Sequence, residues 1–425
     1  MPELGLFDVQ TGSMDPRDSA LAHAIVDAAI TRWLTLDYLI SGLSGRQLRD
    51  QEPRMQAVLL GGATQLLLMD RIPPHAAIDE SVEWAKLNIR PGAAGMVNAI
   101  LRKVSRAKGD KTEGWNHHLD TIPLADGKGL KLNDIELPSN GLHRLSVACS
   151  ISSELIQRWE NHFGDPTPQA MHTLCKSPTV FNVAATNDPL DETKLLEHNS
   201  KNHRVYLGGR SDLLGLLEKY PDIWVQDAAS SHVVEDIELG NMTGLIVDLC
   251  AGKGTKTRQL QAKYPEATIV AADVEEKQLD TLYDVFASDD RVHTMDVESA
   301  MDQYIGKADL VLTDVPCTNS GVLARRREAR YRPLKKQLGR IVPLQREIAK
   351  NAHALLKPNG MLVYSTCSVE CEENEEQAKW IEEKLGMKSL GDRRLDPNGQ
   401  PGEHWSRYHD GSYSAQFLKV EPEAD

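Results

Sequence analysis

The chain has few cysteines, few aromatic side chains and no long apolar run. Its six cysteines among 425 residues include no Cys-x-x-Cys pair, which disfavours a disulfide framework or a zinc knuckle and favours reduced thiols. No run of about 18 apolar residues occurs and the first residues are acidic, so we predict neither a membrane span nor a secretory signal. We expect a cytoplasmic protein with no membrane or metal partner.

Positive charge is also in deficit. The chain has 48 Lys and Arg against 62 Asp and Glu, a net charge of −14. This balance disfavours nucleic-acid binding through a diffuse positive surface, so such binding would need a local patch. Hydrophobic residues make up 40% and charged residues 26%, which is typical of globular proteins, and the length predicts two or three domains.

The first hundred residues are predicted to be helical, because apolar residues recur there at helical spacing. Asp15 and Pro16 predict an N-cap and a first helical position. Further helices are expected from Pro53 onward, over residues 76–87 and over 92–104. Residues 108–142 are polar without a sustained period and predict a partly irregular linker. A helix over 145–163 and a small α/β segment from 178 to 227 are expected next.

Beyond residue 240, short β-branched runs alternate with helical segments. The runs are at residues 245–249, 268–272, 309–313 and 361–365, and a further strand is expected to end before Asp296. This alternation predicts a parallel sheet that is covered by helices on both faces. The segment SYSAQFLKV (412–420) predicts a last strand at the edge of the sheet.

A glycine-bearing turn follows the first of these strands, in the segment from Asp248 to Thr257. Gly252 and Gly254 let the backbone approach a ligand closely, and the next helix directs free N–H groups toward it. Asp273 ends the following strand, 21 residues after Gly252, where its carboxylate can accept hydrogen bonds from ribose hydroxyls. These features also fit a nicotinamide-dependent dehydrogenase or an ordinary turn.

Two later strands end near cysteines. Asp314-Val-Pro-Cys317 follows one strand, and Ser365-Thr-Cys367 follows the other. The carboxyl ends of parallel strands meet at one rim of a sheet, so we expect both thiols and Asp314 near the cofactor crevice. A thiolate is a strong nucleophile and a neighbouring acid supplies a proton, so the trio predicts covalent catalysis.

A basic segment follows Cys317. Residues 325–340 contain eight basic residues and one acidic residue, and Tyr331 offers one ring for stacking on a base. We interpret the segment as a local RNA-contact patch, with these candidate residues: Arg325, Arg326, Arg327, Arg330, Tyr331 and Arg332. The acidic run at 370–376 predicts a solvated helix start.

These motifs, in this order, resemble the NOL/NOP/Sun family of RNA cytosine-C5 methyltransferases, and most closely its bacterial 16S ribosomal RNA branch. The similar segments are VQDAAS (225–230), DLCAGKGTKT (248–257), DVPCTNSG (314–321) and YSTCS (364–368). The early helices resemble the NusB-like RNA-binding domain of that branch, and the ending DGSYSAQFLKV resembles its final hairpin. The chain departs from the family pattern at two places. Residues 252–255 read Gly-Lys-Gly-Thr where the family usually has Ala-Pro-Gly-Gly, and Thr318-Asn319 stands where the family usually has Ser-Gly.

The resemblance implies an all-α NusB-like domain followed by a Rossmann-like class I methyltransferase domain, with a mostly parallel doubly wound sheet and an antiparallel terminal hairpin. The implied divisions are 1–140 for the NusB-like domain with its linker, 141–226 for a small connecting α/β subdomain, and 227–425 for the methyltransferase domain. The implied cofactor is S-adenosyl-L-methionine. Its expected contacts are Cys250, Ala251, Gly252, Lys253, Gly254, Thr255, Lys256, Asp273, Asp296 and Asp314, with Asp296 receiving the adenine amino group.

The resemblance also implies the chemistry. Cys367 would add to C6 of an unpaired or flipped cytosine, Asp314 would stabilise charge on the ring, and Cys317 would assist release. DNA cytosine methyltransferases use the Pro-Cys thiol as the nucleophile, so the reverse assignment stays open. The expected substrate is 16S ribosomal RNA. The alternatives are another RNA such as transfer RNA, or a non-catalytic RNA-binding assembly factor.

Overall fold

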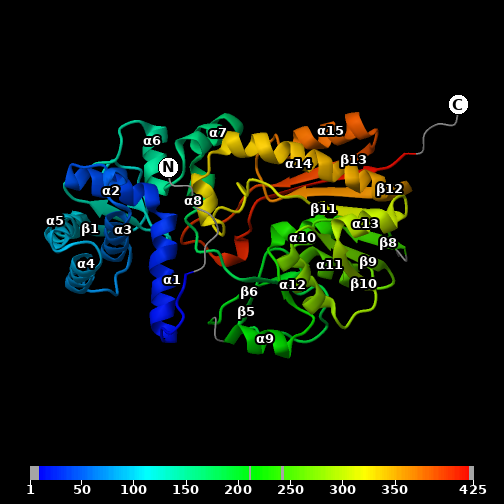
Figure 1. Cartoon of the computed structure of the whole chain (residues 1–425), viewed down its shortest axis with the longest axis horizontal. Helices are drawn as coiled ribbons and strands as arrows, with labels where there is room; N and C mark the ends of the chain where they lie inside the picture. Colours follow the sequence, from blue (N-terminus) through cyan, green and yellow to red (C-terminus); the bar gives the residue numbers. More distant parts are fainter. Residues whose placement is uncertain (1–8, 210–211, 241–243, 421–425) are drawn as a thin grey trace. The chain divides into compact units, whose positions relative to one another are not determined.

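The computed structural model describes residues 9–209, 212–240 and 244–420, and these form two compact units (Figure 1). Unit 1 contains the residues up to Lys176 together with Leu323–Arg332 and Gln400–Glu403. Unit 2 contains Ser177–Val322, Pro333–Gly399 and the residues from His404 onward. The predicted divisions at residues 140 and 226 stay predictions.

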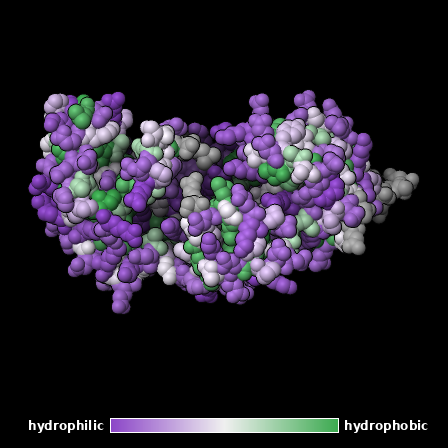
Figure 2. All heavy atoms as spheres, turned by 90° about the horizontal axis from the view of Figure 1, so that it is seen from below, coloured by the Kyte–Doolittle hydropathy of each residue, from purple (hydrophilic) through white to green (hydrophobic). Residues whose placement is uncertain are grey.

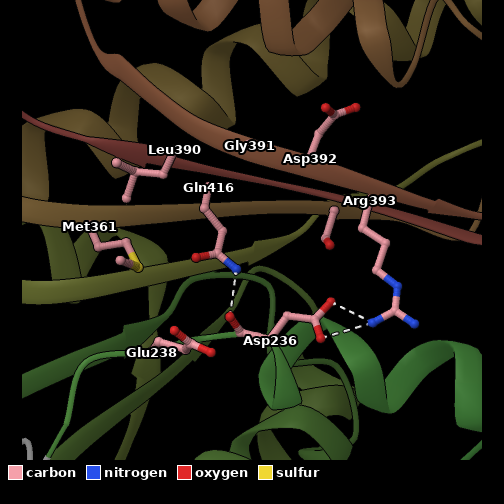
Figure 3. A pocket seen from close by; sticks show the side chains of 9 residues that line it. Asp236, Glu238, Met361, Leu390, Gly391, Asp392, Arg393 and Gln416 are labelled. Carbon is pink, nitrogen blue, oxygen red and sulfur yellow. Dashed lines mark hydrogen bonds and ion pairs between the residues drawn. The ribbon is translucent and has the colours of Figure 1, made fainter.

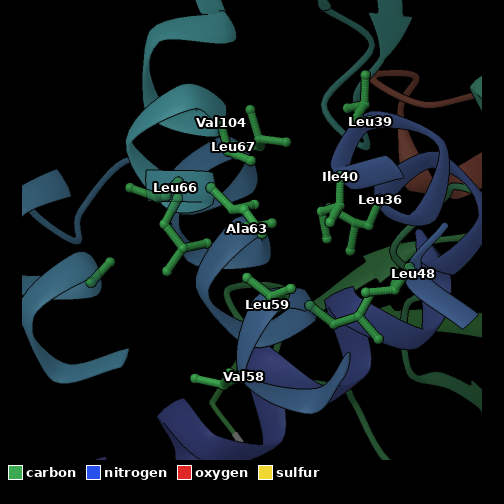
Figure 4. Packing of buried hydrophobic residues seen from close by; sticks show 14 of the residues in the cluster. Leu36, Leu39, Ile40, Leu48, Val58, Leu59, Ala63, Leu66, Leu67 and Val104 are labelled. Carbon is green, nitrogen blue, oxygen red and sulfur yellow. The ribbon is translucent and has the colours of Figure 1, made fainter. Parts of the chain in front are cut away.

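Unit 1 begins with five α-helices around one apolar core. They are α1 (Pro16–Thr31), α2 (Trp33–Ser44), α3 (Pro53–Leu68), α4 (Pro74–Asn88) and α5 (Pro91–Ala107). The predicted N-cap is confirmed, because the Asp15 carboxylate accepts from the backbone N–H groups of Arg17 and Asp18. Apolar side chains of α2, α3 and α5 meet in the core, where Leu59 and Val104 are fully buried (Figure 4).

The prediction of a partly irregular linker over residues 108–142 is partly wrong, because part of this segment folds into a small antiparallel sheet. Its strands are β1 (Lys108–Thr112), β2 (Thr121–Pro123) and β3 (Gly129–Leu132), in the order β1-β3-β2. Ile122 and Leu130 join the helical core, so tertiary packing selects strands too short to show a period. The helices α6 (Gly141–Cys149), α7 (Ser153–Phe163) and α8 (Thr167–His172) follow. The helix predicted over 145–163 is interrupted at Ser150, whose φ is +57°.

Unit 2 is built on a seven-stranded sheet in the order β10-β9-β8-β11-β12-β14-β13. The parallel strands are β8 (Leu245–Asp248), β9 (Thr268–Asp273), β10 (Val292–Asp296), β11 (Ala308–Asp314) and β12 (Leu356–Thr366). The antiparallel pair β13 (Lys388–Leu395) and β14 (Ser412–Leu418) completes it. The predicted edge position of the last strand is wrong, because β13 pairs with the free side of β14 and becomes the edge.

Helices cover both faces of this sheet, as predicted (Figure 1). One face packs against α13 (Val297–Tyr304), α14 (Leu334–Leu355) and α15 (Glu375–Leu385). The other packs against α10 (Ala228–Glu235), α11 (Thr255–Lys263) and α12 (Glu276–Phe286). Successive residues Ile246 and Val247 of β8 enter opposite cores, so this strand is apolar on both sides.

A smaller antiparallel sheet precedes the large one in unit 2. Its strands are β4 (Val180–Asn182), β5 (Leu195–Glu197), β6 (His203–Tyr206) and β7 (Trp224–Val225), in the order β5-β6-β4-β7, with the helix α9 (Leu213–Lys219).

Among the described residues, no helix combines the length and apolarity that crossing a membrane requires. Hydrophilic side chains cover most of the face seen in Figure 2, with apolar residues in separate small groups.

Candidate active site

The predicted catalytic and cofactor-binding residues lie at or just after the carboxyl ends of five adjacent parallel strands. From β8, the chain winds through β9 and β10 on one side and through β11 and β12 on the other. The strand order therefore reverses between β8 and β11, and a ligand crevice is expected at such a point. The pairing sets Asp296 opposite Asp273 and Asp314 opposite Ser365.

The loop after β8 takes the conformation that its glycines permit. Gly252 and Gly254 have φ of +56° and +79°, in the left-handed region, and Gly254 is the N-cap of α11. A Cβ at Gly254 would lie 2.6 Å from the Phe286 ring, so no larger residue fits without a shift. The N–H of Gly252 donates to Asp273 Oδ2 at 2.9 Å, which joins the loop to the end of β9.

Asp248 supplies an unusual buried carboxyl group beneath this loop. It is 1% exposed, and its Oδ2 accepts from the Thr257 hydroxyl at 2.7 Å, whereas its Oδ1 has no partner among the described residues. Burial raises the pKa of Asp248 from 3.8 to about 7. A buried acceptor without a donor fits a site that a ligand amino group or hydroxyl completes.

The other predicted cofactor contacts lie on the same loop with different exposures. Ala251 is buried, Cys250 and Thr255 are half-buried, and Lys253 is exposed. Burial, then the charges of neighbouring carboxylates, raises the pKa of the Cys250 thiol, which keeps this thiol protonated. The structure therefore does not offer Cys250 as a competing nucleophile.

Lys256 and Asp296 each have a partner within the protein. Lys256 Nζ forms an ion pair with Asp314 Oδ2 at 2.6 Å, and the Ser365 hydroxyl donates to the other carboxylate oxygen at 2.9 Å. Asp296 caps α13 by accepting from the backbone N–H and the hydroxyl of Ser299, both at 2.8 Å. The backbone bond from Ser299 is the main reason why the pKa of Asp296 is lowered.

The two thiols predicted at the rim are in contact. Cys317 Sγ and Cys367 Sγ are 3.0 Å apart, although 50 residues separate them in the chain. Cys317 is 8% exposed and Cys367 is half-buried, so Cys367 is the more accessible thiol. The hydrogen bond to Cys367 and then burial raise the pKa of Cys317 well above its ordinary value. Cys317 therefore stays protonated and can donate its S–H to Cys367.

Backbone contacts hold the two thiol loops together. Gly321 N–H donates to the carbonyl of Cys367 at 3.0 Å, and Gly411 N–H donates to the carbonyl of Gly321 at 2.7 Å. A Cβ at Gly321 would lie 2.8 Å from the Cys367 oxygen. The close approach of the loops therefore requires glycine at this position.

A buried carboxylate that sequence reasoning missed joins the residues that flank both thiols. Glu373 is fully buried and accepts from the N–H and hydroxyl of Thr318, from the hydroxyl of Ser368, and from the Gln345 amide. The same amide also donates to the carbonyl of Pro316. Burial raises the pKa of Glu373, and these donors oppose that rise. One carboxylate thus fixes the residues before and after Cys317 and the residue after Cys367.

The acidic run at 370–376 was therefore wrongly predicted as wholly solvated. Glu370 and Glu373 are 3% and 0% exposed, whereas Glu375 and Glu376 begin α15 as expected. Nothing in the local charge pattern distinguishes the two groups. The only feature of the sequence that sets Glu373 apart is its position six residues after Cys367, close to a thiol loop.

The structure corrects the RNA-contact prediction for Arg330 and Tyr331. Their side chains are 0% and 1% exposed, and both lie inside unit 1. Arg330 donates to the carbonyls of Thr31, Cys149 and Thr173, and the Tyr331 hydroxyl contacts the carbonyl of Ile30. Neither side chain is available to an RNA surface in this conformation.

The other predicted RNA contacts are more accessible. Arg326 is exposed, and Arg325, Arg327 and Arg332 are half-buried. Arg327 forms an ion pair with Asp27 at 3.0 Å, and Arg332 forms one with Glu328 at 3.3 Å. These four arginines stay RNA-contact predictions.

A separate hollow of about 410 Å³ lies beside β13 and β14 in unit 2 (Figure 3). Arg393 forms an ion pair with Asp236 at 2.9 Å there, and Gln416 donates to the carbonyl of Asp236. The lining residues include none of the thiols or cofactor-loop residues.

Among the residues that the structure describes, no group of three or more His, Cys, Asp or Glu is arranged to hold a metal ion.

Comparison with known families identifies both parts of the chain. Residues 239–400 match the family model described as 16S rRNA methyltransferase RsmB/F, and residues 3–106 match the NusB family model. Ribosomal RNA small subunit methyltransferase B of Escherichia coli O6:K15:H31 is 27% identical over 439 residues, which cover 95% of this chain and 91% of that protein. The protein of the same name from Enterobacter sp. (strain 638) is 27% identical over 385 residues, covering 85% and 81%.

Solved structures show the same fold. PH0851 has a TM-score of 0.70 at 20% identity and covers 96% of this chain and 91% of its own. A methyltransferase homologue from Pyrococcus horikoshii has a TM-score of 0.54 at 20% identity and covers 67% of this chain and all of its own. Together with the family models, these similarities confirm the predicted fold class of a helical NusB-like domain before a mostly parallel Rossmann-like sheet.

Proposed function

We propose that this chain is a member of the RsmB/F family of 16S ribosomal RNA methyltransferases and methylates C5 of a cytosine in small-subunit ribosomal RNA. The observation that carries the proposal is the 3.0 Å contact between Cys317 Sγ and Cys367 Sγ at the rim of the sheet. Methylation at C5 of cytosine needs one sulfur that bonds to the ring and a second group that assists its release. Two thiols in contact beside a carboxylate supply both requirements.

In this mechanism, the Cys367 thiolate forms a bond to C6 of the cytosine. The ring then carries an electron-rich C5, which takes up a methyl group. Negative charge builds up on the ring near N3, and Asp314, held by Lys256 and Ser365, would stabilise it by carrying a proton and donating it toward N3. For release, Cys317 would first lose its own proton to solvent, and its thiolate would then take the proton from C5. The C5–H electron pair re-forms the C5–C6 double bond while the bond between C6 and Cys367 breaks, and Cys367 leaves as a thiolate.

The residues around the loop after β8 fit S-adenosyl-L-methionine, which supplies a methyl group on a positively charged sulfur. The Asp248 Oδ1 without a donor fits a ligand amino group or hydroxyl. Asp273 ends β9, where a carboxylate can accept from ribose hydroxyls. Free N–H groups of the first turn of α11 suit a carboxylate. Asp296 extends this row at the end of β10, as the adenine contact of the proposal.

The exposures of the two thiols support Cys367 as the nucleophile. Cys367 is more accessible, whereas Cys317 is nearly buried and has a raised pKa, which favours a proton-carrying role. The reverse assignment would require the more deeply buried sulfur, whose pKa is raised, to attack the ring. A target base must leave its helical stack to reach either sulfur, so the substrate cytosine is unpaired or flipped.

A pair of substitutions tests the proposal. Cys367→Ala should abolish both methylation and adduct formation, because no sulfur remains to bond to C6. Cys317→Ala should accumulate a covalent complex with RNA, visible as a slow band on denaturing gels, because release is impaired. Cys175→Ala, at a thiol in unit 1, is the matched control and should retain activity.

Normal turnover by Cys317→Ala would contradict the two-thiol scheme. A covalent complex from Cys367→Ala would instead reverse the roles of the two cysteines. Bisulfite sequencing of ribosomal and transfer RNA from cells with and without the gene identifies the substrate. A wild-type protein that binds RNA without methylating any RNA class would favour an assembly factor.

A further inference from the structure

Asn319 lies beside both thiols in a backbone conformation that asparagine tolerates and glycine favours. Its φ is +63°, in the left-handed region, and it is two residues after Cys317. Its side chain contacts both thiol-bearing residues. Cys367 Sγ lies 3.2 Å from Asn319 Oδ1, and Asn319 Nδ2 lies 3.2 Å from the carbonyl oxygen of Cys317.

The orientation of this amide follows from its partners. A carbonyl oxygen only accepts hydrogen bonds, so the NH₂ group of Asn319 must face the Cys317 carbonyl. The amide oxygen then faces Cys367 and accepts its S–H. With the Cys367 hydrogen used in this way, the remaining S–H of Cys317 points at Cys367 Sγ. The three residues are thus linked in a ring: the Cys317 S–H donates to Cys367 Sγ, the Cys367 S–H donates to Asn319 Oδ1, and the Asn319 amide donates to the carbonyl of Cys317.

We propose that Asn319 is a positioning residue that holds the Cys367 thiol by accepting its S–H, and so fixes the sulfur and its proton between substrate-binding events. This inference rests on the proposed roles of the two thiols. It adds a residue that acts through Cys367 and not through the substrate. Release of the S–H from Asn319 becomes part of forming the attacking thiolate.

Two substitutions separate this role from simple packing. Asn319→Gly suits the positive φ and removes the acceptor, so the Cys367 S–H is no longer held. Asn319→Asp keeps the shape and the acceptor but adds a negative charge, which disfavours a thiolate next to it. If the Asn319 side chain only filled space, both substitutions should make Cys367 more reactive, because both remove the hydrogen bond from the Asn319 amide to the carbonyl of Cys317.

The first measurement needs neither RNA nor cofactor. The full-length protein is treated briefly with neutral iodoacetamide at pH 7, and the modified Cys367 peptide is quantified by mass spectrometry. We expect Cys367 to react at least threefold faster than wild type in Asn319→Gly and at least threefold slower in Asn319→Asp. Wild-type rates in both variants, or changes in the same direction, would overturn the inference.

The second measurement is steady-state methylation. We expect kcat to fall about tenfold in Asn319→Gly with KM for RNA within about twofold, because the sulfur is misplaced and RNA contacts are intact. Asn359→Gly is the matched control, since Asn359 also has a positive φ, +59°, but is exposed and away from the thiols. An unchanged kcat in Asn319→Gly would contradict the positioning role. An inactive wild type with the expected alkylation pattern would contradict the proposed function alone.

Discussion

At the scale of single residues, the site depends on buried polar groups whose ionisation the fold controls. Asp248 and Glu373 lie in the interior and form no ion pair with the residues that the structure describes, and burial raises the pKa of both carboxyl groups. Such groups destabilise a folded protein when they are ionised, so their presence has to be explained by what they hold. Glu373 holds the two thiol loops, and Asp248 holds Thr257 and presents one free acceptor.

Asp248 predicts a pH dependence of stability. Its pKa is 3.8 when unfolded and about 7 when folded, so between these values the folded state binds a proton that the unfolded state has released. Stability therefore falls as pH rises from about 4 to about 7. Asp248→Asn should remove this loss and exceed wild type by up to about 4 kcal/mol at pH 8, at about 1.4 kcal/mol per pKa unit.

Urea unfolding at several pH values, without added cofactor, measures this difference. The difference between Asp248→Asn and wild type should shrink as pH falls and approach zero near pH 3, where Asp248 is mostly protonated in both states. A difference that is the same at pH 4 and pH 8 would contradict the assignment of a proton to this buried carboxyl.

At the scale of elements, the short helix η3 (Arg327–Tyr331) acts as a shared cap for three helices of unit 1. Arg330 donates to Thr31 at the end of α1, to Cys149 at the end of α6 and to Thr173 just after α8. The last carbonyls of a helix lack partners within it and carry partial negative charge. Three helix ends thus compensate a buried cation that has no carboxylate partner within the described part of the chain.

This arrangement predicts that Arg330→Ala strongly destabilises unit 1. Removing the guanidinium leaves several buried carbonyls without donors, so we expect a loss of about 3 kcal/mol or more. Arg326→Ala, at an exposed arginine four residues earlier, should change stability by less than about 0.5 kcal/mol. Hydrogen exchange should locate the loss at the last turns of α1, α6 and α8. Equal effects of the two substitutions would contradict the capping role.

The sequence predicted the elements whose signals are local. Runs such as 309–313 and 361–365 are long and β-branched, so their strands and the thiols that follow them were found together. The strands β1 to β3 have three to five residues and depend on the helical core. The burial of Arg330 and Glu373 depends on partners far along the chain, and an arginine run or an acidic run carries no sign of them.

At the scale of the whole molecule, the proposed function requires an acidic chain to bind an acidic polymer. The net charge is −14, so long-range electrostatic repulsion opposes RNA binding, and local cations must supply the attraction. Arg326 and Arg340 belong to the basic segment 325–340 and are exposed. Arg326 lies in unit 1, and Arg340 lies on α14 of unit 2.

The salt dependence of RNA binding tests whether these cations contact phosphates. Each contact with single-stranded RNA releases counterions and adds about 0.7 to the slope of log affinity against log salt concentration. Arg326→Gln with Arg340→Gln should therefore weaken binding and reduce the slope by about 1.4. Lys384→Gln with Lys388→Gln makes the same charge change at exposed positions outside the segment and should leave the slope within about 0.3. If both pairs change the slope equally, RNA responds to total charge, and the basic segment loses its assigned role.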